Sequence, residues 1–279
     1  DVCSSDLRGL PNAGNAHVNP LQELDARTIR GLFFDIDDTL TTDGQLTAEA
    51  YTALARWHNS GRLAIPITGR PAGWCDHIAR MWPVDAVVGE NGAFWFAYDR
   101  SKRRLSKRFL QDDATRHAHR LQLQRIEQEI LVAVPGCAVA SDQRYREADL
   151  AIDFCEDVPA LPMQAAQRIA AHMRAAGMNA KISSIHVNGW FGDYDKLSMT
   201  RILMREYFAI DLDAQRAHYV FIGDSPNDAP MFAWFTHSVG VANVQEFAAL
   251  IETKPRYITP GRSGLGFVEL VDHLLAHTG

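Results

Sequence analysis

The stretch that decides the fold is IRGLFFDIDDT, residues 29–39. It begins as a short apolar run, which predicts a buried strand, and acids start where that run ends, at Asp35. Ligands bind beyond the carboxyl ends of strands in a parallel α/β sheet. Side chains two positions apart on an extended segment point the same way, so Asp35 and Asp37 can face one substrate while Asp38 points away. Taken alone, the same residues also fit an acidic surface turn.

Apolar runs alternate with helical segments after this stretch and again near the other end of the chain. A helix is expected over residues 47–59, and residues 63–67 and 84–88 are the next strand candidates. Later, a helical segment at 197–208 precedes a strand candidate at 218–222. Short, mostly apolar strands that alternate with helices predict an α/β fold with a parallel sheet.

The middle of the chain has a different pattern and predicts a separate unit. Its helices and strands, which include a strand candidate at 180–187, indicate an inserted α+β domain over residues 89–188. The α/β core is then expected to consist of residues 25–88 and 189–279. Residues 1–24 are polar and without a clear period, and are expected to form a loose N-terminal arm.

A second acidic segment, GDSPND at residues 223–228, also follows directly after an apolar strand candidate. It places Asp224 and Asp228 at a strand-to-helix junction, where simple helix capping is the plainer alternative. Two like charges 4 Å apart repel by about 4 kcal/mol at an effective dielectric of about 20. The carboxylates of the two segments, once clustered, therefore need a cation. Oxygen ligands suit Mg²⁺, which in turn predicts a phosphate-bearing substrate.

Two further segments supply groups that suit phosphate. Thr68, Gly69 and Arg70 follow the second strand candidate, and a hydroxyl with free backbone N–H groups at a helix start binds phosphate oxygens. A helix start with a solvated arginine is the plainer alternative. A lone lysine is usually a solvated surface charge. Lys196 is a candidate because of its position, where the chain returns from the insert to the α/β core.

Two features of the insert relate to the choice of substrate. His186 and Asn188 lie two apart on a strand candidate, so they are expected to share a face that either reads sugar hydroxyls or faces solvent. The basic run at residues 100–108 predicts a solvated hairpin, or else a surface that attracts an anionic substrate.

The four segments, in this order, resemble the motifs of the haloacid-dehalogenase superfamily of phosphohydrolases. Its motifs are DxDx[TV] after an apolar strand, a strand ending in Thr or Ser, a lysine, and a GDxxND block. The matching residues here are Asp35, Asp37 and Thr39, then Thr68, Lys196, Asp224 and Asp228. The insert lies where the C2-type cap lies in the Cof-like sugar-phosphatase group, subfamily IIB. The resemblance, over residues 29–276, implies a Rossmann-like α/β core with a parallel sheet and an inserted α+β cap.

The resemblance also implies a mechanism and a cofactor. Asp35 is expected to attack phosphorus and form an aspartyl-phosphate, while Asp37 acts as general acid and then as general base. Mg²⁺ is expected at the Asp35 carboxylate, the Asp37 backbone carbonyl and Asp224. Asp228 completes the expected metal site by ordering a metal-bound water or Lys196. The residues expected to bind phosphate or substrate are Thr68, Gly69, Arg70, Lys196, Asn227, His186 and Asn188.

The expected activity is hydrolysis of a small, sugar-like phosphomonoester. One alternative is a phosphotransferase similar to phosphomannomutase, in which a sugar rather than water accepts the phosphoryl group. A non-enzymatic phospho-aspartate receiver is less expected, because receivers of that kind are much shorter and have no cap.

Composition limits the classes of partner. The 279 residues contain 28 Lys and Arg against 34 Asp and Glu, a net charge of −6 at pH 7, which argues against nucleic-acid binding. Apolar runs fall short of the roughly 18 residues that span a bilayer. The four cysteines form no C-x-x-C pair. We expect a cytoplasmic protein with a small phosphorylated metabolite as its partner and no membrane association, and the sequence leaves the oligomeric state open.

Overall fold

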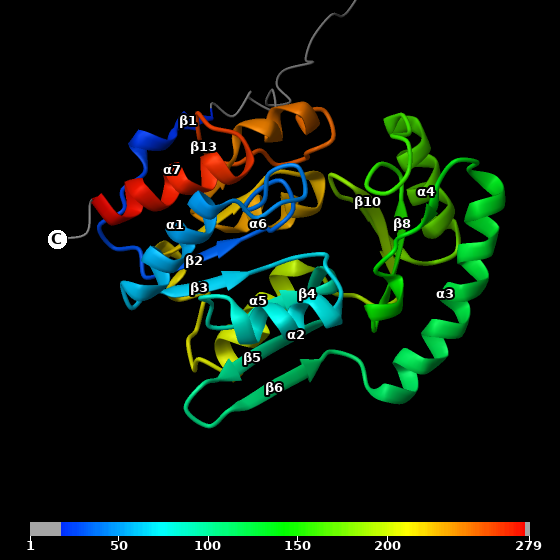
Figure 1. Cartoon of the computed structure of the whole chain (residues 1–279), viewed down its shortest axis with the longest axis horizontal. Helices are drawn as coiled ribbons and strands as arrows, with labels where there is room; N and C mark the ends of the chain where they lie inside the picture. Colours follow the sequence, from blue (N-terminus) through cyan, green and yellow to red (C-terminus); the bar gives the residue numbers. More distant parts are fainter. Residues whose placement is uncertain (1–17, 277–279) are drawn as a thin grey trace, which may run out of the picture.

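The computed structural model, drawn in Figure 1, describes residues 18–276. Its largest sheet has six parallel strands in the order β1-β13-β12-β11-β2-β3. The strands are β1 (Asn19–Pro20), β2 (Gly31–Phe34), β3 (Leu63–Pro66), β11 (Tyr219–Gly223), β12 (His237–Gly240) and β13 (Tyr257–Ile258). Because β2 lies between β11 and β3, the apolar run at the start of the deciding stretch forms a central strand. The predicted parallel α/β sheet is confirmed.

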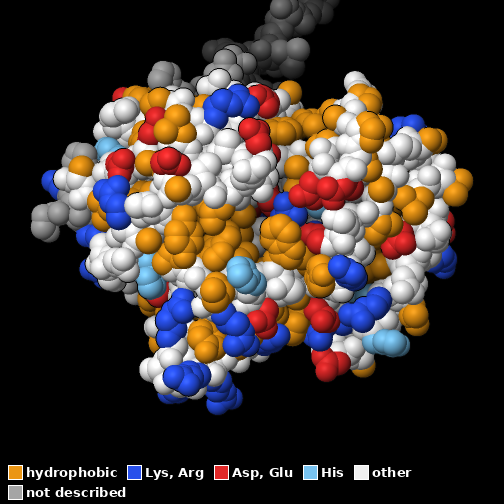
Figure 2. Space-filling view, in the orientation of Figure 1, with side chains coloured by type: hydrophobic (Ala, Val, Ile, Leu, Met, Phe, Trp, Pro, Cys, Tyr) orange, Lys and Arg blue, Asp and Glu red, His pale blue; other side chains and the backbone are white. Residues whose placement is uncertain are grey.

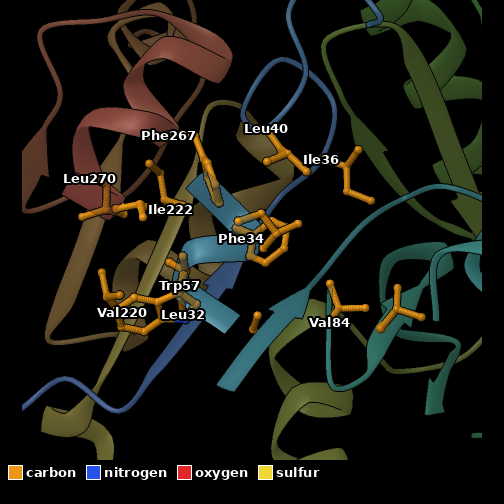
Figure 3. Packing of buried hydrophobic residues seen from close by; sticks show 14 of the residues in the cluster. Leu32, Phe34, Ile36, Leu40, Trp57, Val84, Val220, Ile222, Phe267 and Leu270 are labelled. Carbon is orange, nitrogen blue, oxygen red and sulfur yellow. The ribbon is translucent and has the colours of Figure 1, made fainter. Parts of the chain in front are cut away.

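Helices cover both faces of this sheet, because alternate residues of each strand point to opposite sides. The core helices are α1 (Ala48–Asn59), α2 (Ala72–Met81), α5 (Lys196–Glu206), α6 (Ala229–Trp234) and α7 (Ser263–Ala276). Leu32 and Phe34 of β2 pack in the hydrophobic cluster of Figure 3. That cluster also contains Trp57 of α1 and Phe267 of α7. Phe33 lies in a second cluster, together with residues of α5 and α6.

Local chemistry sets the ends of α1. The Thr47 side chain accepts a hydrogen bond from the N–H of Ala50, which caps the start of the helix. Beyond its end, Gly61 adopts a φ of +79°, a conformation that side chains disfavour. The helix predicted over residues 47–59 is confirmed. Short 3-10 helices in the connections are η1 (Leu21–Glu23), η2 (Glu90–Gly92), η3 (Gln143–Tyr145), η4 (Arg216–His218), η5 (Pro226–Asp228) and η6 (Ala242–Phe247).

A small antiparallel sheet extends the core beyond β3. Its strands are β4 (Val87–Gly89), β5 (Phe94–Asp99) and β6 (Arg104–Phe109). A parallel bridge between Ile67 and Val88 joins it to the edge of the large sheet. Phe94 and Phe96 of β5 lie in the same cluster as β2, and Trp95 lies in the second one. These strands therefore pack with the α/β core, although β5 and β6 fall inside the range expected for the insert.

The cap lies to one side of the core in Figure 1. It consists of α3 (Asp113–Ala133), β7 (Ala138–Val139), β8 (Asp149–Asp153), α4 (Met163–Ala175), β9 (Asn179–Ile182) and β10 (His186–Trp190). Its four strands form an antiparallel sheet in the order β7-β8-β10-β9. Residues of α3, α4 and one face of this sheet form a hydrophobic cluster of their own. The predicted inserted α+β cap is confirmed. In the described residues, no helix combines the length and the apolar character needed to cross a bilayer.

The prediction of a single strand over residues 180–187 is wrong, because the structure has two strands there. β9 and β10 pair in antiparallel fashion, with a tight turn between them. Ser183 closes this turn: its N–H donates to the carbonyl of His186, and its Oγ accepts from the N–H of His186. Hydroxyl side chains favour such turns through local backbone hydrogen bonds.

The first described residues belong to the core. Asn19 and Pro20 pair with β13 in parallel, and Leu21 and Leu24 are buried. The prediction of a loose arm is therefore wrong for residues 18–24, because Leu21 and Leu24 are buried in the core. Residues 1–17 of that expected arm lie outside the described residues.

Candidate active site

Acidic residues from two distant segments meet at the carboxyl edge of the core sheet. Asp35 follows β2, Asp224 follows β11, and Asp228 lies in η5 just beyond. One carboxylate oxygen of each lies within 4.8 Å of the others, and all three residues are buried. The structure thus brings Asp35 and Asp224 close enough to share an ion.

Lys196 supplies a positive charge to this buried group. Its Nζ donates to Asp35 Oδ1 at 2.8 Å and to Asp228 Oδ1 at 2.7 Å. The Asp195 carboxylate accepts from the N–H of Ser198, which fixes the start of α5 and so the position of the lysine. Although burial opposes a charged amine, Asp228 and Asp35 hold the pKa of Lys196 above its ordinary value. The lysine is therefore protonated at neutral pH.

Full ionisation would leave this group with an unbalanced negative charge. Three carboxylates and one ammonium sum to −2 when all are ionised. Burial raises the pKa of Asp35 to about 8, and the nearby Asp228 and Asp37 add to this rise. Burial also raises the pKa of Asp224, with Asp35 as the next cause. A buried set of oxygen donors with surplus negative charge fits a hard divalent cation such as Mg²⁺.

Asp224 is held in place by neighbours on both sides. The Thr39 hydroxyl donates to Asp224 Oδ1 at 3.2 Å, and the Asn243 amide lies 3.4 Å from Asp224 Oδ2. The same Asn243 amide donates to the backbone carbonyl of Asp38 at 3.0 Å. Asn243 therefore ties the loop after β2 to the loop after β11.

Asp228 is fixed by backbone contacts that require a glycine. Its Oδ2 accepts from the N–H of Asp224 at 3.0 Å and from that of Ser225 at 3.3 Å. A Cβ atom at Gly223 would lie 2.3 Å from this oxygen, so only glycine allows the close approach. Asp228 thus braces the loop with one oxygen and holds Lys196 with the other.

Asp37 lies outside the group of three acids and pairs with Arg70 instead. Arg70 Nε is 3.0 Å from both carboxylate oxygens of Asp37, and Nη2 is 2.8 Å from Oδ1. Nη2 also donates to Glu156 of the cap at 2.7 Å, and the guanidinium lies over the Trp74 ring. Arg70 therefore connects the core to the cap. A phosphate-binding role for Arg70 and a metal contact of Asp37 through its backbone carbonyl both stay predictions.

Thr68 and Gly69 form a tight loop after β3, next to Asn91. The Thr68 hydroxyl accepts from the N–H of Arg70 at 3.0 Å, and the Thr68 carbonyl accepts from the N–H of Asn91. Asn227 Nδ2 lies 3.4 Å from Asn91 Oδ1. The Asn91 Nδ2 atom is buried and has no hydrogen-bond partner in the described part of the chain. A buried amide without a partner suits a ligand oxygen.

The two cap residues expected to touch substrate are buried and engaged in ion networks. Asn188 Nδ2 donates to Asp149 Oδ2 at 2.9 Å, and His186 Nε2 lies 2.8 Å from Glu156 Oε2. His186 pairs with Asp153, and Asn188 with Ala151, across the β8–β10 ladder. Neither residue faces open solvent, and their substrate contacts stay a prediction.

Glu90 links the core to the cap through the backbone. Its Oε1 accepts from the N–H of Ala72 at 3.0 Å and from that of Glu147 at 2.9 Å. Its Oε2 accepts from Ala148 at 2.6 Å and from Asp149 at 3.2 Å. One buried carboxylate thus ties the first turn of α2 to the chain that enters β8.

A cavity of about 330 Å³ lies between core and cap, beside Asp37 and Arg70. It is lined by Asp37, Asp38, Thr41, Asp43, Gly44, Arg70, Cys155, Glu156, Ser184 and Ile185. The basic run is elsewhere: Figure 2 shows Lys and Arg gathered over the hairpin of β5 and β6. In that hairpin Lys102 pairs with Asp99 and Lys107 with Asp76. A solvated hairpin is what the structure shows for this run.

Glu90, Asn91, Asn243 and Glu156 were not among the expected site residues. Glu90 and Asn91 follow β4, so the strand-end rule that found Asp35 would also have found them. Glu156 follows β8 of the cap in the same way, although in an antiparallel sheet. Asn243 had no such signal, because its role depends on how two loops meet.

Comparison with known proteins agrees with this geometry. The model of the haloacid dehalogenase-like hydrolase family matches residues 32–154. No curated protein matches the chain.

Several solved structures share the fold over nearly their whole length. A protein of Thermoplasma acidophilum has a TM-score of 0.65 at 18% identity, covering 89% of this chain and 99% of its own. A putative HAD/COF-like hydrolase of Plasmodium vivax has a TM-score of 0.62 at 16% identity, covering 90% and 96%. The sucrose-phosphatase of Synechocystis, solved with sucrose and phosphate, has a TM-score of 0.57 at 17% identity, covering 89% and 98%. The family model agrees with the resemblance found in the sequence over residues 32–154, and the solved structures share with this chain a parallel α/β core and an inserted cap.

Proposed function

We propose that the protein is a Mg²⁺-dependent phosphomonoesterase that acts on a small, sugar-like phosphate through an aspartyl-phosphate at Asp35. The observation that carries the proposal is the contact of one buried ammonium, Lys196 Nζ, with both Asp35 and Asp228 beside a third buried acid, Asp224. Such a group places a positive ammonium, and acids that can hold a cation, at the position where a phosphoryl group would react. Phosphoryl transfer is promoted mainly by positioning and by neutralising spread negative charge.

In the first step, an Asp35 oxygen forms a bond to phosphorus as the bond to the leaving oxygen breaks. Asp37 gives its proton to that leaving oxygen. In the second step, Asp37 takes a proton from water, whose oxygen attacks phosphorus and breaks the bond to Asp35. Inorganic phosphate leaves, and both carboxyl groups return to their starting states.

Other residues hold the transferring group. Lys196, the Thr68 hydroxyl and the buried Asn91 amide are donors that suit phosphoryl oxygens. When bound, Mg²⁺ at Asp35, Asp224 and the Asp37 carbonyl would neutralise charge on the phosphoryl oxygens. Arg70 orients Asp37 by donating hydrogen bonds to its carboxylate.

The size of the cavity supports a small substrate. Its volume, about 330 Å³, is near the lower end of ligand pockets, roughly 300 Å³. Sucrose is the ligand named for one structural neighbour. A monosaccharide-sized leaving group suits the space beside Asp37.

The test is phosphate release from a panel of phosphorylated metabolites in the presence of Mg²⁺. We expect Asp35→Asn to abolish turnover, and a chelator to stop it until Mg²⁺ is restored. The matched control is Asp272→Asn, a surface acid of α7 paired with Arg56, which should retain activity. Full activity of Asp35→Asn would refute the proposal. Conversion of a hexose monophosphate to an isomer, without phosphate release, would favour the phosphotransferase instead.

A further inference from the structure

The cavity beside Asp37 is lined by more acids than bases. Asp37, Asp38, Asp43 and Glu156 contribute carboxylates, and Arg70 contributes a guanidinium. With every group ionised, the lining therefore carries a net charge of −3. A bound group in this space meets a negative surface.

The single guanidinium of this lining is already engaged. Arg70 Nη2 lies 2.8 Å from Asp37 and 2.7 Å from Glu156, and Nη1 lies 3.5 Å from Asp142. It is 4% exposed. Arg70 therefore offers little to an anionic group on a ligand.

The two remaining acids have unmatched charge. Neither Asp38 nor Asp43 forms an ion pair within residues 18–276. Burial raises the pKa of Asp38, and Ser184, across the boundary with the cap, opposes this rise. Thr41, the other hydroxyl of the lining, donates to the carbonyl of Ile36. What the cavity offers to a ligand is thus mainly carboxylate oxygen, which accepts hydrogen bonds.

This space adjoins the leaving-group side of the proposed reaction. Asp37, which would protonate the leaving oxygen, lines it, whereas Asp35, Thr68 and Lys196 do not. From the proposed function together with this lining, we infer that the leaving group carries hydroxyl or ammonium donors and no second negative charge. The cavity then sets specificity by repelling substrates with a carboxylate or a second phosphate on the leaving group.

The experiment compares three phosphates of six-carbon sugar derivatives that differ in charge away from the phosphate. The probes are glucosamine 6-phosphate, glucose 6-phosphate and 6-phosphogluconate, which carry an ammonium, no further charge and a carboxylate. For each, kcat/KM is measured, together with its inhibition constant against p-nitrophenyl phosphate turnover, at fixed Mg²⁺ and ionic strength. We expect the carboxylate probe to be disfavoured at least about tenfold against the other two, since like charges a few ångströms apart repel even in water.

The variant that tests the cause is Asp38→Asn/Asp43→Asn. Both positions have positive φ, +53° and +49°, which Asn tolerates well, so the backbone is preserved. The matched control is Asp213→Asn/Asp272→Asn, which neutralises two surface acids outside the cavity lining. We expect the double variant at Asp38 and Asp43 to reduce the discrimination against 6-phosphogluconate roughly tenfold, and the control to leave it unchanged.

Equal use of the three probes by the wild type, or a preference for 6-phosphogluconate, would overturn the inference. So would discrimination that survives in the double variant. Failure of the wild type to hydrolyse p-nitrophenyl phosphate in Mg²⁺ is a separate result, and it would count against the proposed function itself.

Discussion

Arg70 Nε lies 3.0 Å from both carboxylate oxygens of Asp37, and Arg70 Nη2 lies 2.8 Å from one of them. The same Nη2 donates to Glu156, which belongs to the cap. The proposed acid–base residue is therefore oriented by a side chain that also contacts the cap. One guanidinium therefore contacts both Asp37 of the core and Glu156 of the cap.

Arg70→Lys is expected to lower kcat by about 10- to 100-fold, with a smaller change in KM. An ammonium cannot reproduce the planar, two-pronged contact with a carboxylate, and general acid–base catalysis contributes about 10²–10⁴ to rates. The measurement is steady-state hydrolysis of p-nitrophenyl phosphate.

Two controls separate this effect from a loss of stability. Arg201→Lys, at a surface pair with Asp213, should leave kcat unchanged. In the double variant Asp37→Asn/Arg70→Lys, the two losses should not add, because Arg70 acts through Asp37. Additive losses would show that Arg70 acts independently of Asp37.

Most of the core and the acidic edge of its sheet could be predicted from the sequence. Apolar runs that end in acids placed Asp35 and Asp224 at neighbouring strand ends, since β2 and β11 pair directly. That rule depends only on local pattern and on the geometry of parallel sheets.

The contacts between core and cap could not be predicted in this way. Arg70 and Glu156 are 86 positions apart, and their pairing depends on how the cap docks. The turn at Ser183 was missed because residues on both sides of it have strand character. The burial of His186 and Asn188 also follows from docking, because their face of the cap sheet turns toward the core.

Glu156→Gln is expected to reduce stability at neutral pH and to have little effect in acid. Burial alone would raise the pKa of Glu156, but hydrogen bonds from His186 and Arg70 lower it from 4.5 to about 2. A carboxyl with a lowered folded-state pKa stabilises the fold above its unfolded pKa, and this contribution is lost as pH falls toward 2. After allowance for partial exposure, the difference from wild type should be about 1–2 kcal/mol at pH 7.

Urea unfolding of the two proteins between pH 7 and pH 3 measures this difference. Glu252→Gln, at an exposed position of the core, is the control and should follow the wild type throughout. A gap between wild type and Glu156→Gln that stays constant down to pH 3 would contradict the assigned ion pairs.

Mg²⁺ is expected to bind more tightly as pH rises from 6 to 9. Burial, with Asp228 and Asp37, raises the pKa of Asp35 to about 8 in the metal-free protein. Carboxyl groups must lose their protons before they bind a cation, so binding releases protons. Titration calorimetry in buffers of different ionisation enthalpy measures both affinity and proton release.

The matched variants for metal binding are Asp224→Asn and Asp213→Asn. Saturation at about 100 times Kd stabilises a protein by about 2.7 kcal/mol, so Mg²⁺ should raise the Tm of the wild type and of Asp213→Asn. Asp224→Asn should lose most of this shift. An unchanged shift in Asp224→Asn would place the cation elsewhere.

Glu90→Gln is expected to loosen the cap while leaving the core sheet intact. The carboxylate accepts from the backbone N–H groups of Ala72, Glu147, Ala148 and Asp149. A glutamine amide would turn an NH₂ donor toward some of these donors, and hydrogen bonds to a charged group contribute about 1.5–3 kcal/mol each. The amides of residues 147–149 should therefore exchange with solvent about 10- to 100-fold faster, since 1.4 kcal/mol corresponds to a factor of ten.

Hydrogen exchange followed by mass spectrometry measures this, with the amides of β2 and β11 as internal reference. Equal acceleration in β2 would mean that Glu90 stabilises the whole fold rather than the junction between core and cap.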